Sequence, residues 1–168
     1  MSKTEEQDRY RVKSLVGAGE MTEDVLARST MHADYVDHFF VDVAVAATPE
    51  RWARAMFGDV PTAAERFIWQ GLLQLKLIGG WTPTSVAGWR IAEATSQWIR
   101  LETRSHSLTV HLVIHAANGR LELTTFVRYD RGLGRWVWVP LSAVHRRLAP
   151  SVLTDAISRL GSRATPRV

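Results

Sequence analysis

Apolar and polar residues alternate with a period of two through most of residues 88–139. Five stretches carry this alternation, and their sequences are GWRIAEA, WIRLETR, SLTVHLVIHA, RLELTTFVRYD and RWVWV. Because successive side chains of a β-strand point to opposite faces of its sheet, the pattern predicts five strands. The connections between the stretches are short, which is typical of an antiparallel meander with one apolar face.

The dipeptide Asn118-Gly119 is the strongest hairpin signal in the chain. A two-residue turn at this position keeps the apolar residues of both strands on one face, whereas a slip of one residue would mix the faces. The predicted opposing pairs are His115 with Glu122, Ile114 with Leu123, Leu112 with Thr125, Val110 with Val127, and Leu108 with Tyr129. His111 and His115 then lie on the outer face, where His115 meets Glu122 as a surface contact and not as part of a metal site.

The same register assigns residues of the flanking strands to the two faces. A four-residue turn, RGLG, continues the meander and places Tyr129 opposite Trp136. Val127 then faces Trp138, so both tryptophans are expected on the inner, concave face. At the other edge, Ile99, Leu101 and Thr103 are expected on the inner face. Their neighbours Arg100, Glu102 and Arg104 are expected to face outward. Trp89, Ile91 and Glu93 join the inner face in one of the two registers that the ATSQ turn allows.

One strand and two short helices are predicted before the meander. Residues 34–45, DYVDHFFVDVAV, are rich in aromatic and β-branched residues and form the strand. Thr48 is a suitable N-cap for a helix over residues 49–57. Thr62 and Glu65 have capping-box spacing and open the second helix, which is expected to end at a Gly-Gly pair.

The C-terminal part is predicted to form a long helix, with Pro140 in its first turn. Apolar residues and one histidine fall on one stripe with spacings of four, three, four and four. This stripe consists of Leu141, His145, Leu148, Val152 and Ala156. His145 therefore faces the sheet, whereas Arg146 and Arg147 point away from it. Pro150 removes one backbone hydrogen bond and is expected to kink the helix.

Length and composition fit a single globular domain. The chain has 168 residues, of which 46% are hydrophobic and 23% charged. We expect a flexible arm over residues 1–31 with one short helix near residues 22–28, a domain over residues 32–161, and a tail over residues 162–168. Because the chain has no cysteine, disulfides, thiolate zinc sites and a cysteine nucleophile are excluded. We expect a cytoplasmic protein without a signal peptide or a membrane-inserted segment.

Positive charge is concentrated in the C-terminal third of the chain. The net charge is +4, and nine arginines oppose Glu122, Asp130 and Asp155 in residues 119–168. Such a region can contact an anionic surface or a nucleic acid. No zinc-finger, cold-shock or RNA-binding aromatic motif accompanies it, so nucleic-acid binding is not expected. A solvated arginine-rich surface is the simpler interpretation.

One strand, two short helices, a curved antiparallel meander and a long C-terminal helix follow the order of the helix-grip fold. The motifs ADYVDHF, TFVRYDRG and VWVPLSAVHRRLAP resemble the START-like, polyketide cyclase–like (SRPBCC) superfamily, in a single-domain branch. The resemblance covers residues 33–160. It implies an α+β fold with six or seven strands around the last helix. It also implies a deep apolar cavity between the two, gated by loops near the short helices.

A cavity of this kind predicts non-enzymatic binding of a small hydrophobic molecule such as a lipid, a polyketide or an aromatic compound. The expected site residues are Tyr35, Asp37, Trp69, Glu93, Leu112, Thr125, Val127, Tyr129, Trp136, Trp138, Leu141 and His145. The aromatic residues among them have a simpler interpretation as core packing. No cofactor and no metal are expected.

The alternative is an acid/base enzyme, a polyketide cyclase or dehydratase, which would use His145 and Asp37 as its catalytic groups. Asp37 is placed inward because it alternates with Tyr35 and Phe39 along the first strand. The same two side chains can also satisfy each other and lock that strand to the last helix. A third interpretation is an interaction protein that uses its outer sheet face or its basic tail. An outer-face patch of Val113, Phe126 and Val139 makes a homodimer plausible.

Overall fold

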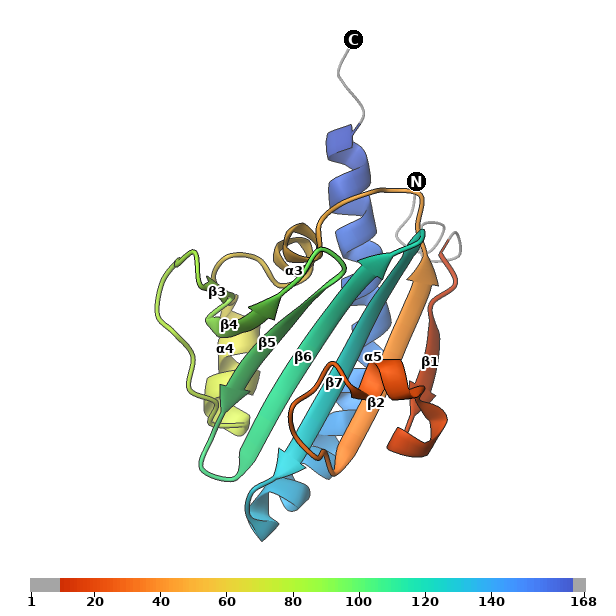
Figure 1. Ribbon diagram of the computed structural model, residues 1–168. Helices are drawn as coiled ribbons and strands as arrows, with labels where there is room; N and C mark the ends of the chain where they lie inside the picture. The colour runs from red at the N-terminus through yellow and green to blue at the C-terminus, as the bar shows by residue number, and fades with distance from the viewer. Residues whose placement is uncertain (1–9, 165–168) are drawn as a thin grey trace.

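A seven-stranded antiparallel sheet and one long helix dominate the computed structural model, which describes residues 10–164 (Figure 1). The strands are β1 Lys13–Val16, β2 Tyr35–Asp42, β3 Ser85–Val86, β4 Trp89–Ala94, β5 Trp98–Arg104, β6 Leu108–Ala117 and β7 Arg120–Tyr129. Their order in the sheet is β1-β2-β7-β6-β5-β4-β3. The helical elements are η1 Ala18–Glu20, α2 Glu23–Leu26, α3 Pro49–Phe57, α4 Ala63–Arg66, the π-helical η2 Phe67–Leu72 and α5 Gly132–Ala164.

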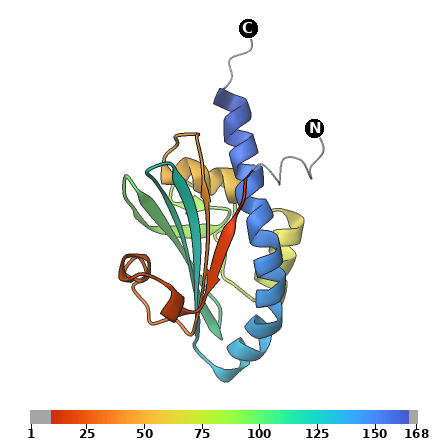
Figure 2. The ribbon, with the colours of Figure 1, turned by 90° about the vertical axis from the view of Figure 1, so that its right-hand side faces the viewer.

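The two faces of the sheet are covered by different parts of the chain (Figure 2). The long helix α5 lies along one face together with α3, α4 and η2, and the N-terminal helices η1 and α2 lie on the other. This arrangement confirms the predicted α+β, helix-grip-like fold. Its main core lies between the sheet and α5, where Trp52 of α3 packs with Leu153 and Ile157, and all three side chains are almost fully buried.

The predicted hairpin between β6 and β7 is confirmed at every pair, from His115 opposite Glu122 to Leu108 opposite Tyr129. The turn residues Asn118 and Gly119 have φ angles of 53° and 72°. Positive φ at both positions matches the right-handed twist of the strands, and asparagine and glycine tolerate it best. The turn chemistry therefore fixed the register that places the remaining side chains.

The prediction for the stretch RWVWV was wrong, because these residues belong to α5 and not to a strand. A buried stripe with helical spacing begins before them and runs through Gly134, Trp138, Ser142, Ala149 and Leu153. Five alternating residues fit a strand and a helix equally well, so the longer period decides. Pro140 lies inside the helix and not in its first turn, and α5 continues through both Pro140 and Pro150.

Residues 10–31 do not form the flexible arm that composition suggested. Lys13–Val16 pairs with β2 as the edge strand β1, and η1 and α2 follow it across the outer face of the sheet. The short helix expected near residues 22–28 is confirmed, with the Thr22 hydroxyl accepting a hydrogen bond from the Val25 amide. Residues 1–9 of the expected arm and 165–168 of the expected tail lie outside the described part of the chain.

The expected apolar patch on the outer face is covered from within the same chain. Val113 and Phe126 are each 1% exposed and form a small cluster with Val36. Met21, Leu26, Met31 and Ala33 from the N-terminal segment, and Trp98, pack against this cluster. Val139, the third member of the expected patch, lies instead on α5. Val113 and Phe126 are therefore not available for a homodimer contact.

Candidate functional site

A cavity of about 350 Å³ lies between the inner face of the sheet, the segment formed by α4 and η2, and helix α5. Its sheet wall comes from β4, β6 and β7, and most of its lining side chains are aliphatic or aromatic. At its rim, Leu72 of η2 and Val144 and Leu148 of α5 remain 42%, 48% and 48% exposed. The cavity therefore opens between η2 and α5, and its mouth is apolar.

Aromatic rings form two sides of the cavity. Trp69 and Trp89 meet edge to face, with ring centroids 5.4 Å apart and an interplanar angle of 83°. Trp138 lies 5.6 Å from the imidazole of His145 and 5.4 Å from the ring of Tyr35. These ring contacts, of which Trp69–Trp89 and Tyr35–Trp138 are edge to face, hold large rings in fixed orientations, so these walls are preformed.

The polar wall is built around Asp37, whose side chain is completely buried. The Nε2 atom of His145 lies 3.3 Å and 3.2 Å from the two Asp37 carboxylate oxygens and 3.1 Å from the hydroxyl oxygen of Thr125. A carboxylate at this distance favours the tautomer that carries its proton on Nε2. The ring nitrogen Nδ1 then keeps a lone pair and has no hydrogen-bond partner in residues 10–164.

Tyr35 and Arg146 extend this network behind the cavity wall. The Tyr35 hydroxyl donates a 2.7 Å hydrogen bond to Asp37 and accepts one of 3.2 Å from the Arg146 guanidinium. Burial and the neighbouring carboxylate raise the pKa of Tyr35 far above its ordinary value, so the phenol stays protonated as a donor. Arg146 also donates to Ser142 of its own helix at 3.1 Å. Because its bond to Tyr35 reaches β2, the prediction that Arg146 points away from the sheet was wrong.

Two cavity-lining tryptophans carry unsatisfied donors. The indole nitrogens of Trp89 and Trp138 are buried and have no hydrogen-bond partner within the described residues. Burying an N–H group without an acceptor costs roughly 1–3 kcal/mol. Together with Nδ1 of His145, they are the polar groups near the cavity that nothing in the described chain satisfies.

The structure brings six of the twelve expected site residues to the cavity wall. They are Trp69, Leu112, Thr125, Trp138, Leu141 and His145. Asp37 and Tyr35 lie directly behind this wall and reach the cavity through His145. Val127 is fully buried, and Tyr129 is half-buried near the end of β7; neither lines the cavity.

Two expected site residues lie elsewhere. Trp136 is 81% exposed because α5 turns it into solvent, whereas the predicted strand would have turned it inward. Glu93 lies on the outer face because a bulge between Ile91 and Glu93 shifts the register of β4 against β5. Its carboxylate pairs with Arg100 at 3.1 Å. A single extra residue in a strand reverses the faces of all residues that follow it.

Most of the wall contributed by residues 65–75 was not predicted from the sequence. The capping box predicted the start of the second helix, and both of its hydrogen bonds, at 3.3 Å and 2.7 Å, join Thr62 and Glu65. The helix was expected to run to the Gly-Gly pair, but it widens into η2 and ends at Leu72. Ile68, Leu73 and Leu75 therefore line the cavity. No local sequence pattern predicted this π-helical turn.

A scan against protein-family models finds no match to this chain, and a search of curated proteins finds none either. In the part of the chain that the structure describes, no helix is both long and apolar enough to cross a membrane. The same residues contain no group of three or more His, Cys, Asp or Glu side chains placed to hold a metal ion. The geometry of the cavity is therefore the feature that bears on function.

Proposed function

We propose that this protein binds a small hydrophobic molecule, without transforming it, in the cavity between the sheet, η2 and α5. The observation that carries the proposal is an apolar cavity of about 350 Å³ in a fold that otherwise packs its core. Protein interiors leave few voids larger than a water molecule, and small-molecule sites occupy roughly 300–1,000 Å³. The exposed apolar rim gives such a ligand a route of entry.

We also propose the chemical class of the ligand. Most of the cavity wall makes only apolar contacts, so a lipid, a polyketide or an aromatic compound with few polar groups suits it. A ligand hydroxyl would be anchored by donating a hydrogen bond to Nδ1 of His145. A site of this kind also agrees with the resemblance to START-like proteins, whose membership we propose for this chain on its motifs and its order of elements.

Filling the cavity tests the proposal directly. Ala149 is buried and lines the cavity, so Ala149→Phe should occupy it, while Ala143→Phe on the exposed face of the same helix is the matched control. The neutral fluorophore N-phenyl-1-naphthylamine is expected to bind the unmodified protein and Ala143→Phe but not Ala149→Phe. Native mass spectrometry and organic extraction of protein from its own host should recover a bound apolar compound. Absence of both dye binding and an extractable compound would overturn the proposal.

A second candidate function, an acid/base cyclase or dehydratase, is favoured by the pairing of His145 with Asp37. In this candidate, Nδ1 of His145 accepts a proton from a bound substrate, and Asp37 orients the ring and stabilises the imidazolium that forms. Acid/base catalysis of this kind requires only these two side chains and a pocket that positions the substrate. If mass spectrometry shows that the extracted compound is converted by the purified protein, His145→Gln should abolish conversion and retain binding. Unchanged conversion would remove this candidate.

A further inference from the structure

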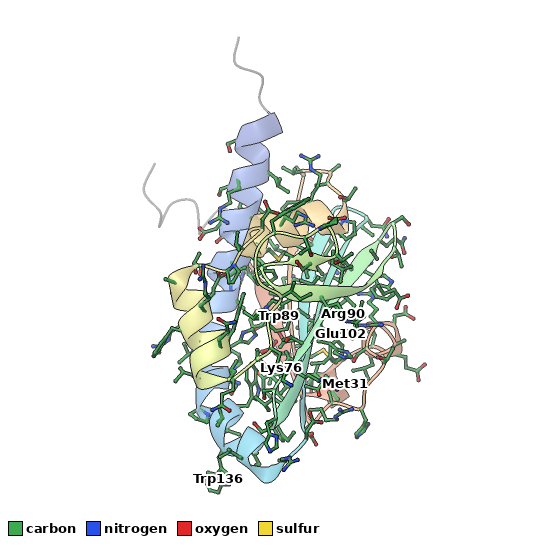
Figure 3. All side chains as sticks on the ribbon, turned by 90° about the vertical axis from the view of Figure 1, so that its left-hand side faces the viewer. Met31, Lys76, Trp89, Arg90, Glu102 and Trp136 are labelled. Atoms are coloured by element: carbon green, nitrogen blue, oxygen red, sulfur yellow. The ribbon has the colours of Figure 1, made fainter. Side chains whose placement is uncertain are left out.

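A second hollow, of about 470 Å³, lies on the outer face of the sheet near the β4 edge. Four cationic side chains line it, and they come from four separate segments of the chain: Lys76, Arg90, Arg104 and Arg128. Glu102 is the only acidic side chain in its lining. Figure 3 shows Arg90, Glu102 and Lys76 at this edge of the sheet, with Trp136 far from them at the end of α5.

Strand register places this hollow on the face opposite the cavity. Arg104 lies opposite Thr109, and Thr109 lies opposite Arg128, so the three residues form one row across β5, β6 and β7. Their neighbours Val110 and Val127 are buried on the inner face. The hollow is therefore a separate feature of the molecule, with its own access to solvent.

Ion pairs within the chain satisfy only part of this positive charge. Arg90 contacts Glu102 at 2.6 Å, and Arg128 contacts Asp130 at 2.6 Å. Glu102 is shared, because Arg100 also donates to it at 2.9 Å. The side chains of Lys76 and Arg104 have no hydrogen bond or ion pair within residues 10–164.

We propose that this outer hollow binds a phosphoryl group. Folding gathers four cations near only two carboxylates, those of Glu102 and Asp130, and the repulsion among the cations falls when a dianion occupies the space between them. Arginine forks and a lysine ammonium are the side chains best suited to phosphate oxygens. Because the side chains of Lys76 and Arg104 need break no hydrogen bond or ion pair within residues 10–164, they supply the first contacts to this ligand.

The test measures binding of inorganic phosphate by amide chemical shifts at constant ionic strength. Shifts are expected to be concentrated at residues 76–78, 88–90 and 102–104. The double variant Lys76→Gln/Arg104→Gln should weaken binding by about fivefold or more, since two charge-assisted contacts are lost. The control, Arg135→Gln/Arg147→Gln, removes two exposed arginines of α5 and the same charge, and it should change the affinity less than about twofold. Equal weakening in both variants, or shifts scattered over α5, would overturn the proposal.

Vesicle binding distinguishes two possible sources of the phosphoryl group, a lipid headgroup and a water-soluble molecule. Vesicles of phosphatidylcholine with about 20 mol% phosphatidic acid are compared with phosphatidylcholine alone in co-sedimentation. Binding that is lost in Lys76→Gln/Arg104→Gln and kept in the control assigns the site to a lipid headgroup. Phosphate binding without vesicle binding assigns it to a water-soluble phosphorylated molecule. Dye binding in the inner cavity should be the same in the unmodified protein and in both double variants, which keeps this test separate from that of the proposed function.

Discussion

The two faces of the central strands reverse the usual relation between polarity and exposure. The inner face is apolar, yet it borders an open cavity whose rim residue Leu148 is 48% exposed. The outer face carries three histidines and several charged residues, yet His38 and His111 are 6% and 4% exposed. The difference shows that the polarity of a strand face does not by itself tell which face is closed. Whether a face of the sheet is buried depends on which other segments of the chain pack against that face.

Residues 28 and 29 fasten the N-terminal segment to the outer face. Arg28 donates to Glu122 at 3.0 Å, and its carbonyl oxygen accepts a 3.0 Å hydrogen bond from Arg100. The hydroxyl of Ser29 lies 3.0 Å from Nδ1 of His111. Burial alone would raise the pKa of Glu122, but hydrogen bonds from His115 and Arg28 outweigh it and lower that pKa to about 2. The outer face therefore keeps its charges through pairing, whereas the inner face is nearly free of them.

Removing the buried carboxylate of the inner face should have the largest effect on stability. Asp37→Ala leaves His145 and Tyr35 without their shared acceptor in a buried site. We expect the free energy of unfolding to fall by about 3–5 kcal/mol, as for other broken buried pairs, measured by urea denaturation. Asp37→Asn retains an acceptor oxygen and should lose less. A loss below about 1 kcal/mol in Asp37→Ala would show that the inner polar wall does not hold β2 to α5.

The second-largest loss of stability is expected from a substitution in the apolar cluster beneath the N-terminal segment. Phe126→Ala removes a fully buried ring and is expected to cost about 3–4 kcal/mol in the free energy of unfolding. Hydrogen exchange should rise in residues 18–34 well before it rises in β6, because only the covering segment loses its contacts. Uniform exchange across the whole sheet would contradict a separately fastened outer layer.

Acid should weaken the outer layer before the inner one. Burial lowers the pKa of His111 to about 4, while the unfolded chain takes up the proton near its ordinary value of 6.5. The folded state therefore loses stability as the pH falls from about 6.5 to about 4, by about 3 kcal/mol in thermal or urea unfolding. His111→Gln should flatten this part of the profile, whereas His106→Gln, at an exposed position, should not. Identical profiles for both variants would assign the acid lability to other groups.

The smallest change in the free energy of unfolding is expected from a substitution at the exposed end of α5. Trp136→Ala should change the free energy of unfolding by less than about 0.5 kcal/mol, because the ring makes few contacts. Trp138→Ala, two residues along, should cost about 3 kcal/mol and weaken dye binding, because this ring is buried and lines the cavity. Equal effects at the two positions would support the strand that the alternating RWVWV pattern suggested.

Sequence patterns predicted part of the site because some of its residues lie in long, regular segments. The alternation of Tyr35, Asp37 and Phe39 placed the carboxylate on the inner face, and helical spacing placed His145 toward it. Both placements are confirmed by the contact between these side chains. The patterns failed where regularity was short or interrupted, as in the five residues of RWVWV and at the bulge before Glu93.

By itself, the sequence determined the strand register and the faces of its longest elements. A period of two and a turn that needs positive φ are local properties, and they act between residues close together in the chain. Only the tertiary structure decided that the inner face borders a cavity and that the outer face is closed. Asp37 and His145 are 108 positions apart, and Arg28 and Glu122 are 94 apart. The space left between such segments depends on how whole layers pack together, and no local pattern encodes it.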